Sequence, residues 1–510
     1  MRLWSTVLLI MTVCECIAIP ANPMPCRMKQ PDGSFVTLRM QGDEYLNFVT
    51  TTDGFTVVRD KRGFWVYASK QADGALAATG MVAHDADDRK ADERAFLDST
   101  PKWLAPKMSD NMAQSRQRER ARRAKTLEQR RAPSNDYYSK FRGLVILVEY
   151  KDRPFMYGDE TNEIMNDIFN KENYTGDSRT NFVDESQDMD VRFVGSVHDY
   201  YRDNSNGLFQ PKFDIVGPVK VNLSQYDAKK TQNSQLLAQT AVDAADPLVD
   251  FSKYDVDGNG EVDFVYLVFS GFTSSIIDND ERLLWPHESS LDYRKDGVTV
   301  GKFACSTEMG VTEQLPMLDG IGTICHEMGH VLGLPDFYDT DNDGSGGTAP
   351  DPGGWSVMAS GVDHMYKHIP CNFTLYERYL LGFCQMPAVL NEVGTYSLRE
   401  VTTNEGFRID SPNNNEFFII ENRQQTGCDV ELPGHGMLVF RVENNPLIWK
   451  ANKVNDNPKH MYYELFLPKD TRAARRPTTR SLEREISPCS RPTRRQPTCE
   501  HGRGRIANMG

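Results

Sequence analysis

The residues best suited to chemistry in this 510-residue chain are two histidines and a glutamate in the stretch "HEMGHVLGLPDFY", residues 326–338. Residues four apart on a helix share a face, so His326 and His330 can present imidazole nitrogens to one metal ion. Glu327 would then lie beside a water molecule at that ion. The flanking residues are apolar, which favours a buried helix. The pattern predicts zinc-dependent hydrolysis, although two histidines at this spacing also occur as ordinary core residues.

A third protein ligand separates these interpretations, because catalytic zinc usually takes three protein ligands and leaves one position for water. Gly333 and Pro335 would end the helix and turn the chain back, which brings Asp336 within reach as an oxygen ligand. A glutamate ligand from a second helix is the other known arrangement, but the next glutamate is Glu377, 47 residues past the second histidine. Asp336 could instead only cap the helix end or join the acidic loop after it. We expect Asp336 to complete the zinc ligands and Glu327 to be the catalytic base.

A methionine in a glycine-bounded turn follows 22 residues after Asp336. In "GGWSVMASG", residues 353–361, Met358 stands at the centre of the turn. Metzincin proteases place a methionine turn as an apolar floor under the zinc ion. A single methionine is more often an ordinary core residue. In this position we expect the floor, with the departure that metzincins normally have histidine where this chain has Asp336.

Two acidic loops resemble the oxygen-rich half of an EF-hand calcium loop. The first is "DVDGNGEVD", residues 255–263, where the glycine of the turn is Gly260 and position 12 is Tyr266 instead of glutamate. The second, "DTDNDG", residues 339–344, repeats the start of the pattern. An Asp-Gly turn without metal is the alternative for both. The expected calcium ligands are Asp255, Asp257, Asn259, the Glu261 carbonyl and Asp263 in the first loop, and Asp339, Asp341 and Asp343 in the second.

The surrounding sequence predicts the elements that must hold these residues. The runs at 141–150 and 262–271 are apolar and typical of buried strands, and the alanine-rich run at 234–249 is typical of a helix. Strands and helices that alternate favour an α/β domain. Residues 26–100 and 388–443 instead carry short strand-like runs between turn residues. We therefore predict a mixed α/β (α+β) domain flanked by two β-rich sections.

The first residues predict export. Arg2 precedes a short apolar run, and small residues precede a possible cleavage site after Ala18, as in a signal peptide. The run is shorter than a membrane span and no later stretch is long enough, so we expect no stable membrane insertion. Export permits oxidation of the cysteines that remain. We expect a Cys305–Cys325 disulfide, because these two residues bracket the approach to the histidine motif.

Charge is unevenly spread along the chain, whose net charge is −14. The segments 116–131 and 471–510 are both strongly basic. Neither has interleaved aromatic residues or a nucleic-acid-binding motif, so we expect no nucleic-acid partner. The first segment is expected to be an exposed linker between a propeptide and a mature enzyme. The second is typical of a disordered tail, and a reading-frame change near the end of the gene would give the same composition.

Several motifs together resemble the M6 peptidase family, the immune inhibitor A-like secreted metalloproteases of the metzincin clan. The resemblance covers about residues 140–465 and implies that His326, His330 and Asp336 bind zinc, that Glu327 is the base, that Met358 forms the methionine turn and that the substrate is protein. The motifs that carry it are "GTICHEMGHVLGLPDFYDTDNDG", "GGWSVMASG", "GSVHDYYRDNSNGLFQPKFDIVGPV", "LLWPH", "DVDGNGEVD" and "FFIIENRQQTGCDVELPGHGMLVFRVENN".

The functional hypothesis is a secreted zinc endopeptidase made as a zymogen, with structural Ca²⁺ beside the catalytic Zn²⁺. A catalytically silent, calcium-stabilised surface or adhesion protein and a zinc amidase are the alternatives. The sequence leaves the oligomeric state open. The predicted organisation is a signal peptide (1–18), a propeptide with a basic linker (19–132), a metzincin-like catalytic domain (133–387), a β-rich C-terminal section (388–470) and an Arg-rich tail (471–510).

Overall fold

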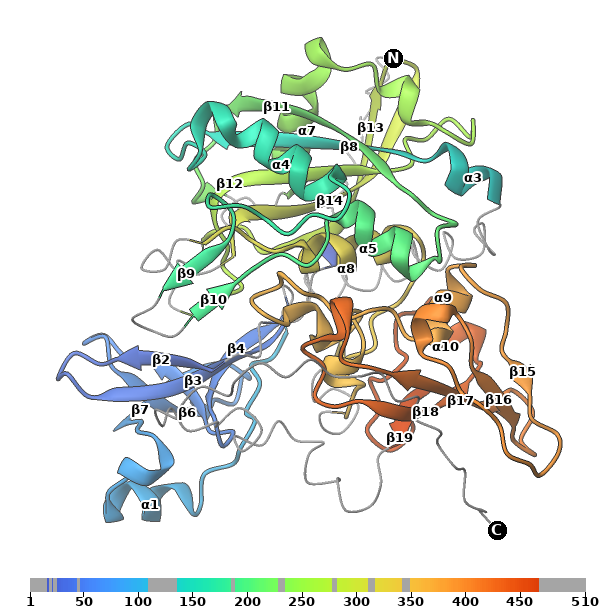
Figure 1. The fold of residues 1–510 in the computed structure, drawn as a ribbon. Helices are drawn as coiled ribbons and strands as arrows, with labels where there is room; N and C mark the ends of the chain where they lie inside the picture. Colours follow the sequence, from blue (N-terminus) through green and yellow to red (C-terminus); the bar gives the residue numbers. More distant parts are fainter. Residues whose placement is uncertain are drawn as a thin grey trace, which may run out of the picture.

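A computed structural model describes most of the chain, namely residues 16–17, 21, 25–43, 46–108, 135–184, 189–227, 234–277, 282–310, 317–341 and 349–466. Within these residues the chain forms two six-stranded sheets, one five-stranded sheet and one two-stranded sheet. The predicted mixture of helices and strands is confirmed (Figure 1). The basic segments 116–131 and 471–510 and most of the predicted signal peptide lie outside the described residues.

None of the helices in the described ranges combines the length and the apolar character needed to cross a bilayer.

The N-terminal sheet is an antiparallel meander whose strands follow one another in sequence order. Glycines at positive φ stand in four of its turns, and Gly33, Gly54 and Gly74 each follow an aspartate. This matches the Asp-Gly turn signals of the sequence. The strands are β2 (Cys26–Lys29), β3 (Phe35–Gly42), β4 (Asn47–Thr51), β5 (Thr56–Arg59), β6 (Trp65–Lys70) and β7 (Leu76–Val82), with helix α1 (Ala91–Leu97) after them.

The central sheet carries the predicted buried strands. Its order is β1-β13-β14-β12-β8-β11, in which β14, β12, β8 and β11 are parallel and β13 and β1 are antiparallel to their neighbours. The strands are β1 (Cys16–Ile17), β8 (Arg142–Tyr150), β11 (Lys212–Val221), β12 (Val265–Phe272), β13 (His287–Lys295) and β14 (Val298–Met309). A small hairpin of β9 (Phe182–Asp184) and β10 (Met189–Val191) lies outside this sheet.

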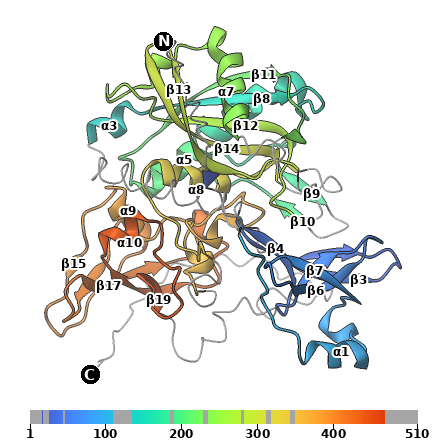
Figure 2. The ribbon, with the colours of Figure 1, turned by 180° about the vertical axis from the view of Figure 1, so that it is seen from behind.

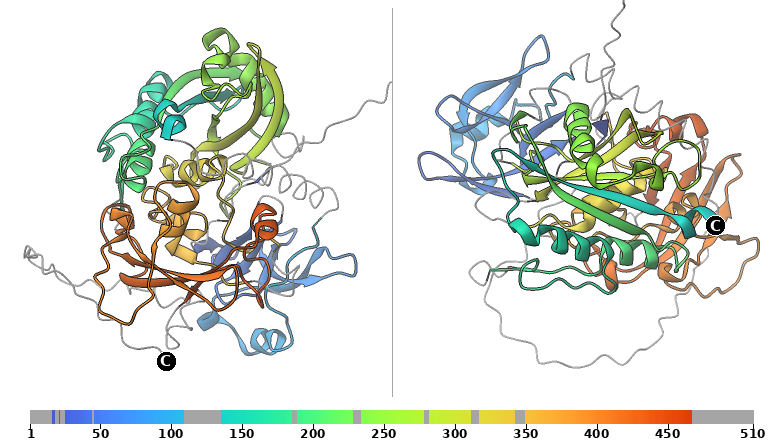
Figure 3. Two further views of the ribbon diagram at one scale, coloured as in Figure 1. Left: turned by 90° about the vertical axis from the view of Figure 1, so that its right-hand side faces the viewer. Right: turned by 90° about the horizontal axis from the view of Figure 1, so that it is seen from above.

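Helices cover both faces of the central sheet. Along β8, Leu144 and Ile146 pack into the core that contains α7 (Ser234–Ala245), whereas Val145 and Leu147 pack into the core on the opposite face. Alternate residues of a strand point to opposite faces, so a continuous apolar run is what a strand buried on both sides requires. The second face is covered by α4 (Thr161–Asn170), α5 (Val197–Asn204) and α8 (Ile321–Val331), and a short helix, α3 (Asn135–Lys140), precedes β8 (Figure 3).

The third sheet is antiparallel except for its first strand pair and belongs to the C-terminal section. Its strand content agrees with the β-rich prediction for residues 388–470. The strands in spatial order are β15 (Ala388–Val389), β16 (Phe407–Asp410), β17 (Glu416–Arg423), β18 (Gly436–Glu443) and β19 (Tyr463–Phe466), with helices α9 (Leu375–Leu380) and α10 (Pro446–Lys450) beside them.

One hydrophobic core runs through the central and the C-terminal parts of the chain. The apolar cluster that contains Met328 of α8 also contains Phe440 of β18 and Tyr463 of β19. The core therefore does not stop at the boundary expected near residue 387. The N-terminal and C-terminal sheets lie on opposite sides below the central sheet, with α8 above and between them (Figure 2). The C-terminal sheet thus lies close enough to α8 to contact the loop that follows this helix.

Candidate metal centre

Helix α8 holds the two histidines in the interior of the protein. All eleven of its residues are buried. The helix ends as predicted, because Gly333 has φ 111°, a left-handed conformation that favours glycine, and its N–H bonds the carbonyl of His330 at 2.9 Å. The N–H of Leu334 then bonds the carbonyl of Gly329 at 2.9 Å. This reversal returns the chain along the helix and brings Asp336 to the histidines.

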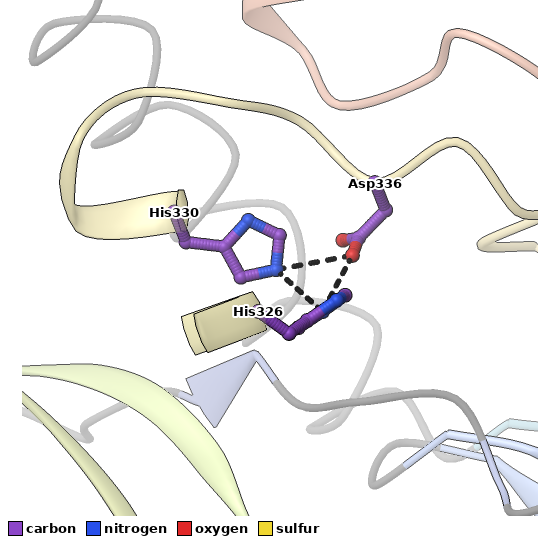
Figure 4. Close-up of side chains that lie close together, drawn as sticks. All are labelled: His326, His330 and Asp336. Atoms are coloured by element: carbon purple, nitrogen blue, oxygen red, sulfur yellow. Dashed lines mark hydrogen bonds and ion pairs between the residues drawn. The ribbon is translucent and has the colours of Figure 1, made fainter. Parts of the chain in front are cut away.

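Three ligand atoms converge at this point (Figure 4). His326 Nε2 lies 2.9 Å from His330 Nε2, and Asp336 Oδ1 lies 3.4 Å from the first and 3.1 Å from the second. Ligands about 2.0–2.2 Å from a tetrahedral zinc ion are about 3.3–3.6 Å apart, close to the observed spacing. The three side chains are 0%, 3% and 1% exposed. The structure therefore brings together the three predicted zinc ligands.

The hydrogen bonds of the two imidazoles explain why this arrangement fits a cation. His326 Nδ1 lies 2.8 Å from the carbonyl oxygen of Val357, and His330 Nδ1 lies 2.9 Å from that of Leu334. A carbonyl only accepts, so in each neutral ring Nδ1 carries the proton and Nε2 presents a lone pair. Two lone pairs and a carboxylate oxygen would repel one another in a buried place. A metal cation at their centre removes this repulsion.

Glu327 follows the first ligand on α8 and is fully buried. Tyr266, on the neighbouring strand β12, is also buried, and burial raises the pKa of its phenol far above the usual value, with the charge of Glu327 adding to the effect. A carboxylate at this position, next to a metal ligand, is suited to accept a proton at the metal site.

The predicted methionine turn lies directly against α8. Met358 is 0% exposed, and a Cβ placed on Gly329 would come 2.8 Å from the Met358 sulfur. The Met358 carbonyl accepts the N–H of Phe337 at 2.9 Å, so the turn also supports the loop that carries Asp336. The neighbouring Val357 holds one of the histidine rings, as described above. Met358 thus packs against the helix that carries the two histidines and supports the loop that carries Asp336.

Glu377, the glutamate considered as an alternative ligand, lies in the first turn of α9 and bonds other groups. Its Oε2 accepts the N–H of Thr374 at 2.6 Å in a capping box that begins α9, and its Oε1 accepts the hydroxyl of Ser356. The Ser356 hydroxyl oxygen in turn accepts the N–H of Met358 at 3.1 Å. Burial raises the pKa of Glu377 to about 7. This glutamate fixes the methionine turn, and Asp336 is the carboxylate that meets the histidines.

One contact to the centre was missed by sequence reasoning. Asn452, in the C-terminal section, donates its amide N–H to Asp336 Oδ2 at 2.7 Å and accepts the Asp336 backbone N–H at 2.7 Å. The two residues are 116 positions apart. Neither periodicity nor motif spacing relates residues so distant, and the short "NKVNDNP" stretch around Asn452 gave no signal of its own.

The first acidic loop has the geometry of a second metal group. Carboxylate oxygens of Asp255, Asp257 and Asp263 lie within 4.8 Å of one another. The Asn259 side chain instead serves the loop backbone, because its Oδ1 accepts the N–H of Glu261 at 2.7 Å. Three of the five predicted residues thus offer side-chain oxygens to a common point.

The second acidic loop is described only in part. Asp339 Oδ2 accepts the N–H of Ala349 at 2.7 Å and its Oδ1 accepts the N–H of Asp341 at 3.0 Å. Burial raises the pKa of Asp339 to about 8. Asp343 lies outside the described residues. In the part of this loop that the structure describes, Asp339 therefore serves as a backbone acceptor.

The predicted Cys305–Cys325 disulfide is not formed. Cys305 lies on β14 with its sulfur 3.5 Å from Nδ1 of His287, whereas Cys325 lies on α8. The carbonyl of Cys325 accepts the hydroxyl of Tyr201 at 2.8 Å. Both cysteines are 0% exposed in the hydrophobic cores on opposite faces of the sheet. The two cysteines cannot pair because a strand and a helix on different layers of the fold hold their side chains apart.

The fold and the centre define a class: a mixed α/β domain with a His-Glu-x-x-His helix and an aspartate that follows a glycine turn. Comparison with known families agrees. Residues 131–370 match the family model of the immune inhibitor A peptidase M6 catalytic domain.

Known relatives are similar over only part of their length. The chain is 26% identical over 255 residues to immune inhibitor A of Bacillus thuringiensis subsp. alesti, which is 43% of this chain and 36% of that protein. It is 25% identical over 346 residues to the pre-pro-metalloprotease PrtV of Vibrio cholerae serotype O1 (strain M66-2), which is 56% of this chain and 35% of that protein. The chain spans about a third of the length of these curated relatives.

Proposed function

We propose that this protein is a secreted zinc-dependent endopeptidase that is made as a zymogen and hydrolyses peptide bonds in proteins. The observation that carries the proposal is the buried convergence of His326 Nε2, His330 Nε2 and Asp336 Oδ1, with Glu327 on the same helix. The match to a peptidase family model and the similarity to a pre-pro-metalloprotease support the same class of activity.

The residues of the chain divide the chemistry among them. Zinc, when bound, polarises the scissile carbonyl and makes water more acidic. Glu327 accepts a proton from the attacking water and later delivers it to the leaving amine. The backbone carbonyls at Nδ1 of His326 and His330 fix the tautomer and the orientation of both rings. Met358 gives the centre an apolar floor, which is the metzincin arrangement proposed for this domain.

The N-terminal sheet supports the zymogen hypothesis through its contacts. Ile277, from the region matched by the catalytic family model, belongs to the hydrophobic core of the N-terminal sheet. Ala21 and Trp285 form a second apolar contact, against which Met40 of β3 packs. Trp285 lies two residues before β13 of the central sheet. We infer that a propeptide docked here obstructs access to the centre until the basic linker is cut.

Removal of the metal gives the direct test of the proposed function. After limited trypsin treatment at the arginine-rich segment 116–131, the protein should digest casein. 1,10-Phenanthroline should abolish this digestion by removing the metal ion, because the proposed mechanism depends on that ion to activate water. Added zinc should restore the digestion. Digestion is measured by release of acid-soluble peptides. Intact casein together with hydrolysis of small amides would favour the zinc amidase, and no hydrolysis of either would favour the silent surface protein.

We further propose that the loop at residues 255–263 binds calcium through the carboxylates of Asp255, Asp257 and Asp263. Asn259 and the Glu261 carbonyl would supply further oxygens. A second calcium site is proposed at Asp339, Asp341 and Asp343. Calcium prefers such oxygen ligands. Calcium at 100 times its Kd should stabilise the protein by about 2.7 kcal/mol, seen as a higher melting temperature. Asp257→Asn should reduce this gain, and Asp159→Asn, an exposed aspartate elsewhere, should not. An equal calcium response in both variants would exclude the first site.

A further inference from the structure

The loop that carries the third ligand is held by the C-terminal section. Asp336 follows the end of α8, so it lacks the helical hydrogen bonds that fix the two histidines. Residues 452–456, here called the C-terminal clamp, supply hydrogen bonds to this loop instead. Asn455 donates to the carbonyl of Phe337 at 2.9 Å, and Asp456 accepts the N–H and the hydroxyl of Thr340 at 3.1 and 2.8 Å. A metal ligand from one half of the chain is thus positioned by the other half.

Within the clamp, Asn452 donates a hydrogen bond to the Asp336 carboxylate. Its amide N–H reaches Oδ2 at 2.7 Å, which leaves Oδ1 directed at the two histidine rings. Its carbonyl oxygen accepts the Asp336 N–H, also at 2.7 Å, so one side chain fixes both the backbone and the carboxylate. Both residues are buried, at 4% and 1% exposure. A primary amide has a donor N–H and an acceptor oxygen on one planar group, which suits it to both contacts.

The backbone at Asn452 is consistent with this role. Its φ is 51°, in the left-handed region that asparagine tolerates better than most residues. It lies two residues after the end of α10, and its N–H bonds the carbonyl of Trp449 at 3.2 Å. Trp449 packs against Phe337, next to the ligand, with ring centroids 5.8 Å apart. The helix end therefore places the amide opposite Asp336, and the position favours asparagine for its backbone as well as its side chain.

We propose that Asn452 is a positioning residue for the metal ligand Asp336, so that the C-terminal section is part of the metal centre. This inference rests on the proposed metal centre but not on peptide hydrolysis. Partners that hold a ligand in the second layer around a metal typically contribute about 10–100-fold to metal affinity or activity. Loss of the amide removes both hydrogen bonds between Asn452 and Asp336, so the carboxylate is held less firmly toward the histidines and the affinity for zinc falls.

The test measures zinc directly in the full-length Glu327→Gln protein, which does not depend on turnover. Asn452→Asp keeps the shape and the left-handed preference but replaces the donor at Asp336 by a carboxylate oxygen. Asn452→Gly removes the side chain without backbone strain. Each variant should bind zinc about 10–100-fold more weakly in competition with a chromophoric chelator. The visible spectrum of the Co²⁺-loaded variants should also change, because it reports the geometry of the ligands.

Two controls separate positioning from general stability. Asn457→Asp changes a neighbouring exposed asparagine whose side chain accepts the N–H of Lys459, and it should bind zinc like the parent. Thr340→Val removes other clamp bonds without touching Asp336, and it should lower the melting temperature of the metal-free protein with little change in zinc affinity.

Parental zinc affinity and Co²⁺ spectrum in both Asn452 variants would overturn the proposal, and so would an equal loss of zinc affinity in Thr340→Val. A parent protein that binds no zinc would instead refute the proposed function itself, so the two failures are distinguishable.

Discussion

Replacement of Glu327 by glutamine should lower kcat/KM for a protein substrate by about 10²–10⁴-fold, because a positioned general base contributes about this factor. The amide keeps the shape of the carboxylate but cannot accept the proton of the attacking water. His326, His330 and Asp336 keep their own partners, so zinc should remain bound at one ion per chain. Initial rates with a quenched fluorescent casein and the zinc content by atomic absorption check the two parts of this expectation.

Glu163→Gln is the matched control for the Glu327 variant. Glu163 lies on the exposed side of α4, where its side chain is 70% exposed in an ion pair with Arg179. Exposed ion pairs contribute about 0–1 kcal/mol, so this variant should retain the activity of the parent protein. Parental activity in Glu327→Gln would contradict the assigned base, whereas a variant that is inactive because it has lost zinc would leave the role of Glu327 as a base without support.

The core of the metal centre was predictable because its residues are neighbours in sequence. His326 and His330 are related by one helical turn, and Gly333 returns the chain so that Asp336 follows within six residues of the second histidine. Met358 was found because its turn is bounded by glycines. Spacing of this kind reflects backbone geometry, which local sequence encodes.

The supports of the centre were not predictable by the same reasoning. Asn452 reaches Asp336 across 116 residues, and Glu377 of α9 accepts the hydroxyl of Ser356, which lies 21 residues earlier in the chain. Such contacts depend on how the C-terminal sheet packs, and no periodic pattern within either segment encodes that packing. The disulfide prediction failed for a related reason, since proximity in sequence to the histidine motif does not place Cys305 and Cys325 on the same layer of the fold.

In the fold, too, the elements encoded by local sequence were predictable, whereas the packing between distant segments was not. The buried strands β8 and β12, the helix α7 and the hairpins of the N-terminal sheet agree with apolar periodicity and Asp-Gly turns. The shared core did not follow from these patterns. Phe440 and Tyr463 lie in strands that look independent in sequence, yet they belong to the cluster that supports α8. The C-terminal section thus shares its hydrophobic core with the helix that carries the two histidines.

A buried arginine of β17 adds polar contacts between the C-terminal sheet and the segment before Met358. Arg423 is 0% exposed and binds Asp429 through two bonds, Nε to Oδ2 at 2.9 Å and Nη2 to Oδ1 at 2.6 Å. Its Nη1 donates to the carbonyl of Trp355 at 3.1 Å, in the segment that enters the methionine turn, and its Nη2 donates to the carbonyl of Asn372 at 3.1 Å. Glu421 lies 3.3 Å from Nη1. One guanidinium thus joins the C-terminal sheet to the floor of the metal centre.

Arg423→Met should reduce the free energy of unfolding by about 3–5 kcal/mol, because removal of one partner leaves Asp429 and Glu421 buried without their compensating charge. Whole-domain stabilities are about 5–15 kcal/mol, so the variant should unfold at clearly lower urea concentration.

Arg192→Met is the matched control. Arg192 and Asp190 form an exposed ion pair at 2.6 Å, with side chains 59% and 55% exposed. Loss of this pair should change the free energy of unfolding by less than about 1 kcal/mol. Urea titrations followed by tryptophan fluorescence compare the two. Equal midpoints would mean that the Arg423 network contributes no more than a surface ion pair, and that apolar packing alone joins the C-terminal sheet to the metal centre.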